Sequence, residues 1–278
     1  MQQHEASPAR VRPGLIPALI VFAIYLVSYR AIGELVGGDV KYTELADSID
    51  NFRDGVAIPV GIAAVIVAAM TSYLGWWRPV LFEARTAPTW LIVWPVLSIA
   101  VMIGNIAGDA DQWDADFLAM LLVGFAFVGF TEELATRGVL LTGARGQYRE
   151  VWAWLISTGC FGAMHSLNAL DGQDVGATAN QVVVTFGIGT LFYFARRITG
   201  TLFVSMALHM LYDAALTIHG GPGAEFSTDV GTPAWGPYVF MVSGAIFLLV
   251  ALITRSLRRE NPGPEIEPLM ASATAQSA

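Results

Sequence analysis

Long apolar stretches alternate with short polar ones along nearly the whole chain. Eight stretches of about 18 to 25 residues carry few charges, which is long enough for a helix to cross about 30 Å of hydrocarbon. Asp, Glu, Arg, Gly and Pro are concentrated between them. The stretches cover residues 14–36, 55–77, 90–107, 117–142, 151–170, 178–198, 200–219 and 236–257. This pattern predicts an all-α fold, a polytopic transmembrane helical bundle of about eight helices.

The composition supports a membrane protein. Of the 278 residues, 55% are hydrophobic and only 14% are charged, whereas soluble proteins average about 25% charged residues. We find no internal repeat and no second set of domain-like segments, so we expect residues 13–260 to form one transmembrane helical domain. Residues 1–12 and 261–278 are polar and contain Pro and Ala, which predicts disordered tails.

The distribution of arginines predicts the orientation of the bundle. Loops rich in Lys and Arg stay cytoplasmic, and with the N-terminus inside, most arginines fall on one side whereas the opposite loops are acidic. The arginines on the inner side are Arg10, Arg12, Arg78, Arg85, Arg145, Arg149, Arg196, Arg197, Arg255, Arg258 and Arg259. Both termini are therefore expected in the cytoplasm. The net charge of −8 reflects the acidic outer loops, and no basic face for nucleic acid is left.

The first apolar stretch is expected to remain in the mature protein. It is longer than the apolar region of a signal peptide, and Tyr25, Tyr29 and Arg30 stand where a cleavage site needs small residues. The single cysteine, Cys160, can form neither an internal disulfide nor a thiolate metal cluster, so we interpret it as a packing residue. The Arg-rich, nearly Lys-free composition is typical of high-GC bacteria. We therefore expect a multi-pass protein of a bacterial plasma membrane, with the lipid bilayer as a partner.

Several ionisable residues lie at membrane depth, inside the predicted helices. Each charged group costs about 2.5 to 3.5 kcal/mol there, so the four charged residues unpaired would cost on the order of 10 kcal/mol. These residues are expected to face the bundle interior and to meet one another or water. They are Glu132, Glu133 and Arg137 in the fourth helix, His165 in the fifth, and His209 and Asp213 in the seventh.

Helical periodicity predicts which of these groups meet. Glu133 and Arg137 are four residues apart and share a face, so they are expected to pair, whereas Glu132 points about 100° away and is freer to act as a general base. His209 likewise precedes Asp213 by four residues, so the carboxylate can fix the imidazole tautomer.

Depth estimates place the glutamates and the imidazoles in one layer. At 1.5 Å per residue from the arginine-rich ends, Glu132 lies about 15 Å deep, His165 about 20 Å and His209 about 14 Å. Three helices contributing such groups at one depth predict a wet cavity that is either hydrolytic or a proton path.

Other interpretations of the same residues stay open at this point. The histidines can be interhelical hydrogen bonds and the Glu–Arg pair buried structural glue, while Phe161 has the character of a packing residue. A divalent ion such as Zn²⁺ could be held by Glu132, His165, His209 and Asp213, or the carboxylate and imidazole could activate water without a metal. An intramembrane Glu, His and Asp chain also fits a proton-coupled membrane transporter, although the repeat symmetry common in transporters is not found.

The ordered set of motifs resembles a known family. E-E-x-x-x-R at Glu132 to Arg137, F-x-x-x-H at Phe161 to His165 and H-x-x-x-D at His209 to Asp213 resemble the CAAX-protease and bacteriocin-processing (CPBP) family of intramembrane endopeptidases, also called the Abi family. The resemblance covers roughly residues 117–219, the motif-bearing core. It implies an enzyme that hydrolyses peptide bonds of a membrane-associated peptide or protein.

The resemblance also implies roles for individual residues. Glu132 and His165 would activate a water for attack on a peptide carbonyl, and Glu133, with Arg137 as its structural partner, would support them. His209 and Asp213 would occupy the positions of the oxyanion-stabilising pair. The eukaryotic members have Asn in place of Asp213, and an ionised carboxylate repels an oxyanion, so Asp213 is expected to orient His209 as an imidazolium donor or to help hold a metal.

The resemblance leaves two questions about the physiological role. A prenylated tail is the eukaryotic substrate and is not expected in bacteria, whereas a membrane peptide or protein cut near the cytoplasmic half of the bilayer fits the depth estimate. Bacterial relatives are linked to bacteriocin maturation or self-immunity. A non-catalytic immunity or scaffold protein with the same fold is therefore a further alternative.

Overall fold

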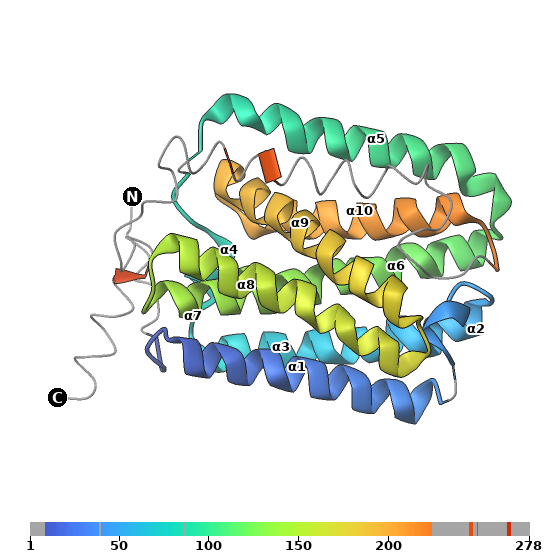
Figure 1. The fold of residues 1–278 in the computed structure, drawn as a ribbon, viewed down its shortest axis with the longest axis horizontal. Helices are drawn as coiled ribbons and strands as arrows, with labels where there is room; N and C mark the ends of the chain where they lie inside the picture. The colour runs from blue at the N-terminus through green and yellow to red at the C-terminus, as the bar shows by residue number, and fades with distance from the viewer. Residues whose placement is uncertain are drawn as a thin grey trace, which may run out of the picture.

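The computed structural model describes residues 9–38, 40–85 and 87–223, together with 245, 246, 249, 266 and 267. Helices account for the regular structure of this part of the chain (Figure 1). The longer helical elements are α1 (Leu15–Val36), α3 (Ile58–Leu74), α5 (Val93–Asp109), α6 (Ala115–Glu133), α8 (Glu150–Met164), α9 (Val175–Thr199) and α10 (Leu202–Gly220). The shorter ones are α2 (Ile49–Phe52), α4 (Trp77–Leu81), α7 (Leu141–Arg145), the 3-10 turns η1 (Tyr42–Glu44), η3 (Thr89–Ile92), η4 (Ala110–Gln112) and η6 (His165–Asp171), and the π-helical segments η2 (Arg53–Ala57) and η5 (Leu134–Leu140).

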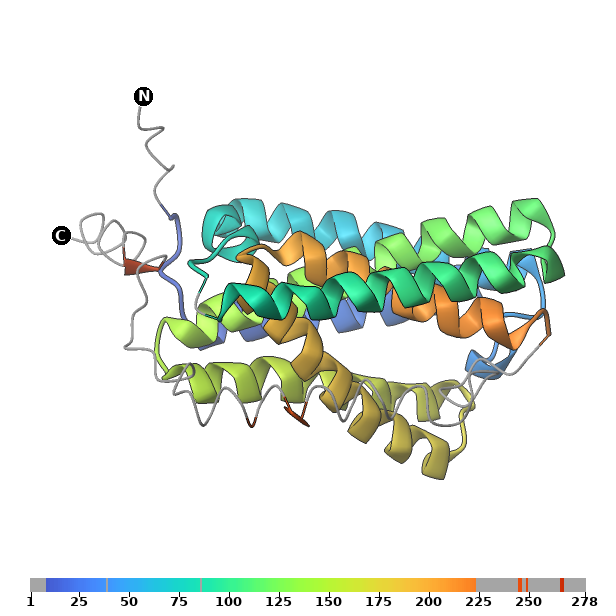
Figure 2. The same cartoon turned by 90° about the horizontal axis from the view of Figure 1, so that it is seen from above.

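Six helical segments of the described chain are long and apolar enough to cross a membrane. They are Leu15–Val36, Ile49–Leu74, Thr89–Gln112, Ala115–Arg145, Val175–Thr199 and Leu202–Gly220. Figures 1 and 2 show most of them running side by side along the long axis, with α9 crossing the others obliquely. The predicted fold class, an all-α polytopic transmembrane bundle, is confirmed.

Two of the eight predicted blocks have no counterpart among these six segments. Block 151–170 forms α8, whose 15 residues span only about 22 Å, and then tightens into the seven-residue 3-10 helix η6. The break falls at His165 and the stretch after it contains Asn168 and Asp171, so apolar length alone overestimated the α-helix. Block 236–257 lies outside the described residues, apart from 245, 246 and 249.

The end of the predicted N-terminal tail is ordered, contrary to the prediction. Arg10 and Val11 donate backbone hydrogen bonds to the Leu74 carbonyl at 3.2 and 3.4 Å. The Trp76 indole N–H in turn donates to the Val11 carbonyl at 2.7 Å. These contacts hold the segment before α1 against the end of α3. Residues 1–8 and most of 261–278 lie outside the described part of the chain.

Close packing of α6 on α10 positions the motif-bearing residues. A Cβ atom at Gly129 would lie 2.6 Å from the Met206 carbonyl oxygen and 2.9 Å from the Met210 nitrogen. Only glycine allows the two backbones to approach this closely, as small residues do at many membrane helix interfaces. The glutamates at the end of α6 follow Gly129 by one turn, so this contact brings them beside His209.

The helix that carries the glutamates changes its winding directly after them. α6, η5 and α7 form one continuous helical segment, and η5, which contains Arg137, is π-helical. A π-helical turn holds an extra residue, and such turns recur at functional sites. The altered winding occurs at the Glu133–Arg137 pair.

Charged residues at the arginine-rich end form a buried cluster. Glu83 accepts from Arg145 at 2.7 Å and from Arg196 at 2.9 Å, and Glu150 pairs with Arg145 and with Arg197 at 3.1 Å. These side chains are at most 3% exposed. Burial alone would raise the pKa of Glu83, but the three arginines outweigh it and lower this pKa to about 2. Three arginines expected in loops thus share one end of the bundle but are buried in ion pairs there.

Candidate active site

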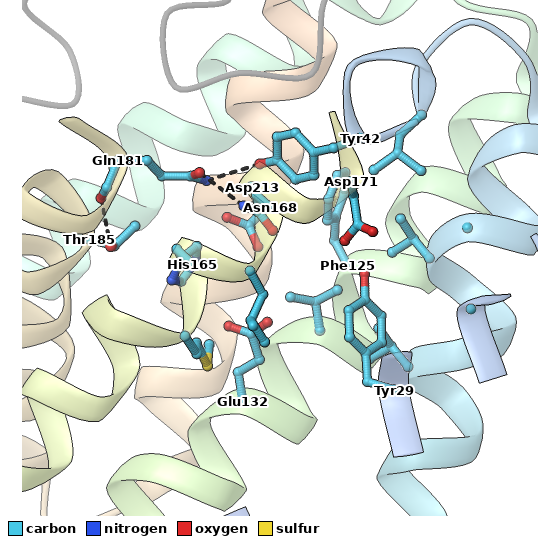
Figure 3. A pocket seen from close by; sticks show the side chains of 18 of the residues that line it. Tyr29, Tyr42, Phe125, Glu132, His165, Asn168, Asp171, Gln181, Thr185 and Asp213 are labelled. Atoms are coloured by element: carbon cyan, nitrogen blue, oxygen red, sulfur yellow. Dashed lines mark hydrogen bonds between the residues drawn. The ribbon is translucent and has the colours of Figure 1, made fainter. Parts of the chain in front are cut away.

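The motif residues converge on one cavity of about 210 Å³ between the helices. Figure 3 shows Glu132, His165 and Asp213 directed toward this cavity from different helices. Glu132 and Glu133 end α6, Arg137 lies in η5, Phe161 in α8, His165 begins η6, and His209 and Asp213 lie in α10. All seven lie in the same region, although Glu133 and Arg137 do not line the cavity. The predicted convergence of three helices is present.

Glu133 and Arg137 form a fully buried ion pair that does not line the cavity. Their Oε1 and Nη1 atoms are 3.0 Å apart and both side chains are 0% exposed. The guanidinium carbon lies 3.8 Å from the centre of the Phe161 ring, a distance at which the cation is attracted to the ring face. A Cβ atom at Gly189 would lie 2.8 Å from Arg137 Nη2, so α9 leaves room for this arrangement. Glu133 is therefore held in place and kept from solvent.

His209 lies among three carboxylates. Its Nδ1 is 3.1 Å from Glu133 Oε1, and its Nε2 is 3.3 Å from Asp213 Oδ2 and 3.7 Å from Glu132 Oε2. The ring stacks on Phe192, with 5.0 Å between ring centres. A ring nitrogen that faces a carboxylate must carry a proton to donate to it. Both nitrogens of His209 meet that condition, which is the arrangement of an imidazolium.

Glu132 is the glutamate that lines the cavity. Its side chain is 14% exposed, compared with 0% for Glu133. Oε1 accepts a hydrogen bond from the Tyr25 hydroxyl at 3.2 Å, whereas Oε2 has no hydrogen-bond partner among the described residues. The two adjacent glutamates therefore differ as helical geometry predicted: one is paired and enclosed, and the other reaches the cavity.

His165 is oriented by the end of its own helix. Its Nδ1 lies 2.9 Å from the Phe161 carbonyl oxygen, and because a carbonyl only accepts, Nδ1 carries the proton. The ring packs edge-on against Phe161, with centres 5.2 Å apart. Nε2 is then the ring nitrogen with a lone pair. His165 and Glu132 line the same cavity.

The residues considered as metal ligands do not fit a metal as a set. Among the described residues, no group of three or more His, Cys, Asp or Glu has the arrangement needed to hold an ion. The chemical reason lies at His209, where both nitrogens face carboxylates and no lone pair is left for a metal. The candidate ligands that remain are Glu132, His165 and Asp213, which come from three different helices. Among the described residues they do not form a group that could hold an ion.

Sequence reasoning missed several cavity residues. Tyr25 of α1 donates to Glu132, and Phe192 of α9 supports His209. Tyr42, Asn168 and Gln181 form a hydrogen-bonded group on another wall. None of these side chains is a histidine or carries a charge at neutral pH, so charge at membrane depth does not identify them. The amides of Asn168 and Gln181 also lie within predicted apolar blocks and were a usable signal.

A comparison with protein-family models bears on this arrangement. Residues 114–215 match an Rce1-like family model. The model describes a type II CAAX prenyl endopeptidase Rce1-like protein. This Rce1-like segment contains all seven motif residues, so the resemblance inferred from them is confirmed. A search of the curated proteins found no match.

The Rce1-like segment covers α6 to most of α10 and leaves out α1 to α5. Tyr25 and Tyr42, which line the cavity beside the motif residues, therefore lie outside it. The site as folded combines the Rce1-like segment with side chains from the N-terminal helices.

Proposed function

We propose that this protein is an intramembrane endopeptidase that cuts a membrane-associated peptide or protein with a water activated by Glu132 and His165. The observation that carries the proposal is the difference between the two glutamates. Glu132 lines a cavity shared with two histidines and is 14% exposed, whereas Glu133 is fully buried and is enclosed by Arg137 and His209. Glu132 Oε2 lies 3.7 Å from His209 Nε2 and accepts no hydrogen bond among the described residues, and a bound water would supply one.

In the proposed reaction Glu132 acts as the general base. It takes one proton from a water whose other hydrogen is accepted by His165 Nε2, and the water oxygen forms a bond to the peptide carbonyl carbon. Glu132 then returns the proton to the amide nitrogen as the carbon–nitrogen bond breaks, which gives a carboxylic acid and an amine. Tyr25, through its 3.2 Å hydrogen bond, positions Glu132 for both transfers.

His209 is proposed to stabilise the oxyanion, with Asp213 as its partner. A protonated His209 would act through its positive charge rather than through a hydrogen bond, because both of its N–H groups already face carboxylates. Asp213, 3.3 Å from Nε2, keeps the proton on the ring. Holding the proton on His209 is a role that a carboxylate can play. Direct contact of Asp213 with the oxyanion is not, because the two negative charges would repel each other.

The same arrangement favours a reaction that needs no metal ion. Each step above uses a side chain already placed at the cavity, and His209 is committed to carboxylates on both nitrogens. We expect cleavage to persist after dialysis against a strong chelator, with metal analysis confirming removal. Activity that is lost on chelation and restored by added Zn²⁺ would contradict this part of the proposal.

The decisive experiment is a cleavage assay with purified protein in detergent. The protein is incubated with a library of membrane-protein peptides, and products are identified by mass spectrometry for wild type, Glu132→Gln and His165→Ala. Wild type should release defined fragments and both variants should release at least about 100-fold less, the usual contribution of a general base. Gln112→Met, at an exposed amide that does not line the cavity, serves as the matched control.

Two results would overturn the proposal. Variants at Glu132 and His165 that cut as fast as wild type would remove the assigned chemistry. Proton flux in liposomes that depends on Glu132, with no cleavage of any peptide, would instead support a proton-coupled transporter.

A further inference from the structure

The cavity has a polar wall that the proposed chemistry does not use. Gln181 of α9 donates its amide to the Tyr42 hydroxyl at 2.9 Å, and Asn168 of η6 donates to Gln181 Oε1 at 2.9 Å. All three line the same cavity as Glu132 and His165. Figure 3 shows them across the cavity from Glu132, with Asp213 between. Tyr42, Asn168 and Gln181 are called the polar strip below.

The polar strip has hydrogen-bonding capacity beyond its internal bonds. An asparagine amide offers two N–H donors and a carbonyl acceptor, and Asn168 uses one donor, for Gln181. No other hydrogen bond of the Asn168 side chain occurs among the described residues. Gln181 is only 5% exposed, and its amide lies in a helix long and apolar enough to span a membrane. Burying an amide is costly unless it is hydrogen-bonded, and Gln181 meets this condition through Asn168 and Tyr42.

A substrate peptide inside this cavity has backbone groups that need hydrogen-bond partners. A peptide bond can be attacked only where the chain is unwound, and an unwound chain exposes backbone N–H and C=O groups. In hydrocarbon those groups find no water, and each unsatisfied one is costly. Much of the remaining cavity wall is aromatic or aliphatic, with residues such as Phe125, Ile188 and Leu216. Side-chain amides and a phenol are well suited to pair with peptide groups.

We propose that the polar strip is a subsite that hydrogen-bonds the backbone of the unwound substrate next to the scissile bond. This rests on the proposed endopeptidase function and adds how the enzyme holds its substrate. Because backbone recognition is independent of side chains, the strip holds the chain in place without selecting a sequence. Asn168 lies three residues after His165 in η6, which ties the substrate register to the attacking water.

The first test separates substrate binding from chemistry. Gln181→Met and Asn168→Leu remove the amides and nearly keep the volume. With the peptide identified by the library assay, each is expected to raise KM about fivefold, since one hydrogen bond contributes about 1 kcal/mol, while kcat stays within about twofold of wild type. Gln112→Met is the control for loss of an amide elsewhere and should keep both constants.

The second test uses the substrate backbone itself and the unaltered enzyme. Peptides in which one amide near the cut site is replaced by an ester lack one N–H donor. At one position the ester should raise KM for wild type, and the same ester should cost Gln181→Met or Asn168→Leu nothing more. Esters without effect on wild-type KM at every position would overturn the proposal, as would ester and variant effects that simply multiply.

The outcomes distinguish the subsite from the function on which it rests. If wild type cuts no peptide, the endopeptidase assignment fails first. If wild type cuts and both strip variants keep the wild-type KM, the subsite alone fails. Thermal unfolding of each variant checks the fold, and if a variant does not fold, the ester series on wild type still decides.

Discussion

At the scale of residues, two neighbouring glutamates have opposite surroundings. Glu133 contacts a guanidinium and an imidazole and is fully enclosed, whereas Glu132 faces the cavity with one hydrogen bond from Tyr25. The backbone explains the difference, because successive helical side chains point about 100° apart. The first residue is then available for chemistry, and the second is needed to neutralise a buried arginine.

Neutralising each glutamate should therefore have a different effect. Glu132→Gln is expected to abolish cleavage and leave the melting temperature nearly unchanged. Glu133→Gln leaves Arg137 buried without its carboxylate, and we expect a loss of roughly 3 to 5 kcal/mol of stability. Thermal unfolding and the cleavage assay on both variants measure the contrast. Equal destabilisation by the two changes would argue against the division of roles.

Loss of the Tyr25 hydroxyl should slow the reaction without weakening substrate binding. A hydrogen bond to a charged group contributes about 1.5 to 3 kcal/mol, so we expect Tyr25→Phe to lower kcat about tenfold, keep KM, and change the pH dependence of kcat/KM. Tyr73→Phe removes an exposed hydroxyl, at a side chain 63% exposed on α3, and should alter none of these. A pH profile identical to wild type in Tyr25→Phe would exclude a positioning role.

At the scale of elements, the site depends on how closely α6 and α10 approach. Gly129 faces the backbone of Met206 and Met210, and His209 lies between these two residues in sequence. Any side chain at position 129 must push α10 away from α6. Because α10 carries His209, the distance between His209 and Glu133 would then increase. The interface thus controls the 3.1 Å contact between the two motifs.

Gly129→Ala is expected to disturb both stability and activity. The added Cβ would lie 2.6 Å from a carbonyl oxygen that cannot rotate away, and overpacking of this kind costs typically about 1 to 3 kcal/mol. Gly104→Ala in α5 is the matched control, because a Cβ there meets nothing within 4 Å. We expect a lower melting temperature and reduced kcat for Gly129→Ala only. A Gly129→Ala protein as stable and active as the control would show that the helices adjust.

The same elements show what sequence periodicity can and cannot predict. Glu133 with Arg137 and His209 with Asp213 are each one turn apart, so the 3.6-residue repeat was enough to pair them. Tyr25 with Glu132 and Gln181 with Tyr42 are 107 and 139 residues apart, and no local rule relates such positions. The apolar blocks likewise predicted membrane helices but not the change at His165 from α-helix to 3-10 helix.

At the scale of the whole molecule, the two ends of the bundle differ in character. One end holds Glu83 and Glu150 in a dry cluster with three arginines. From Glu132 the cavity reaches toward the other end, where Tyr42 and Asp171 line it. The charge distribution alone placed Arg145, Arg196 and Arg197 at one end, but a count of charges cannot distinguish a solvated loop from a buried ion pair. We interpret the cluster as the part that fixes the helices, leaving the cavity end open for substrate.

The cluster should make the fold sensitive to acid in a defined pH window. The arginines lower the pKa of Glu83 from 4.5 to about 2, and that of Glu150 is lowered as well, again by arginines outweighing burial. A carboxyl with a depressed folded-state pKa contributes stability that is fully present above its unfolded pKa and is lost as pH falls through the folded one. The melting temperature of wild type is therefore expected to be flat from neutral pH to about pH 5 and to fall steadily below that.

Glu83→Gln should melt lower than wild type at pH 7, because Arg145 and Arg196 lose their shared partner. The further decrease in its melting temperature between about pH 4.5 and 2 should be smaller than that of wild type. Scanning unfolding in detergent at a series of pH values tests this, and parallel curves for the two proteins would mean that Glu83 is not the group being protonated.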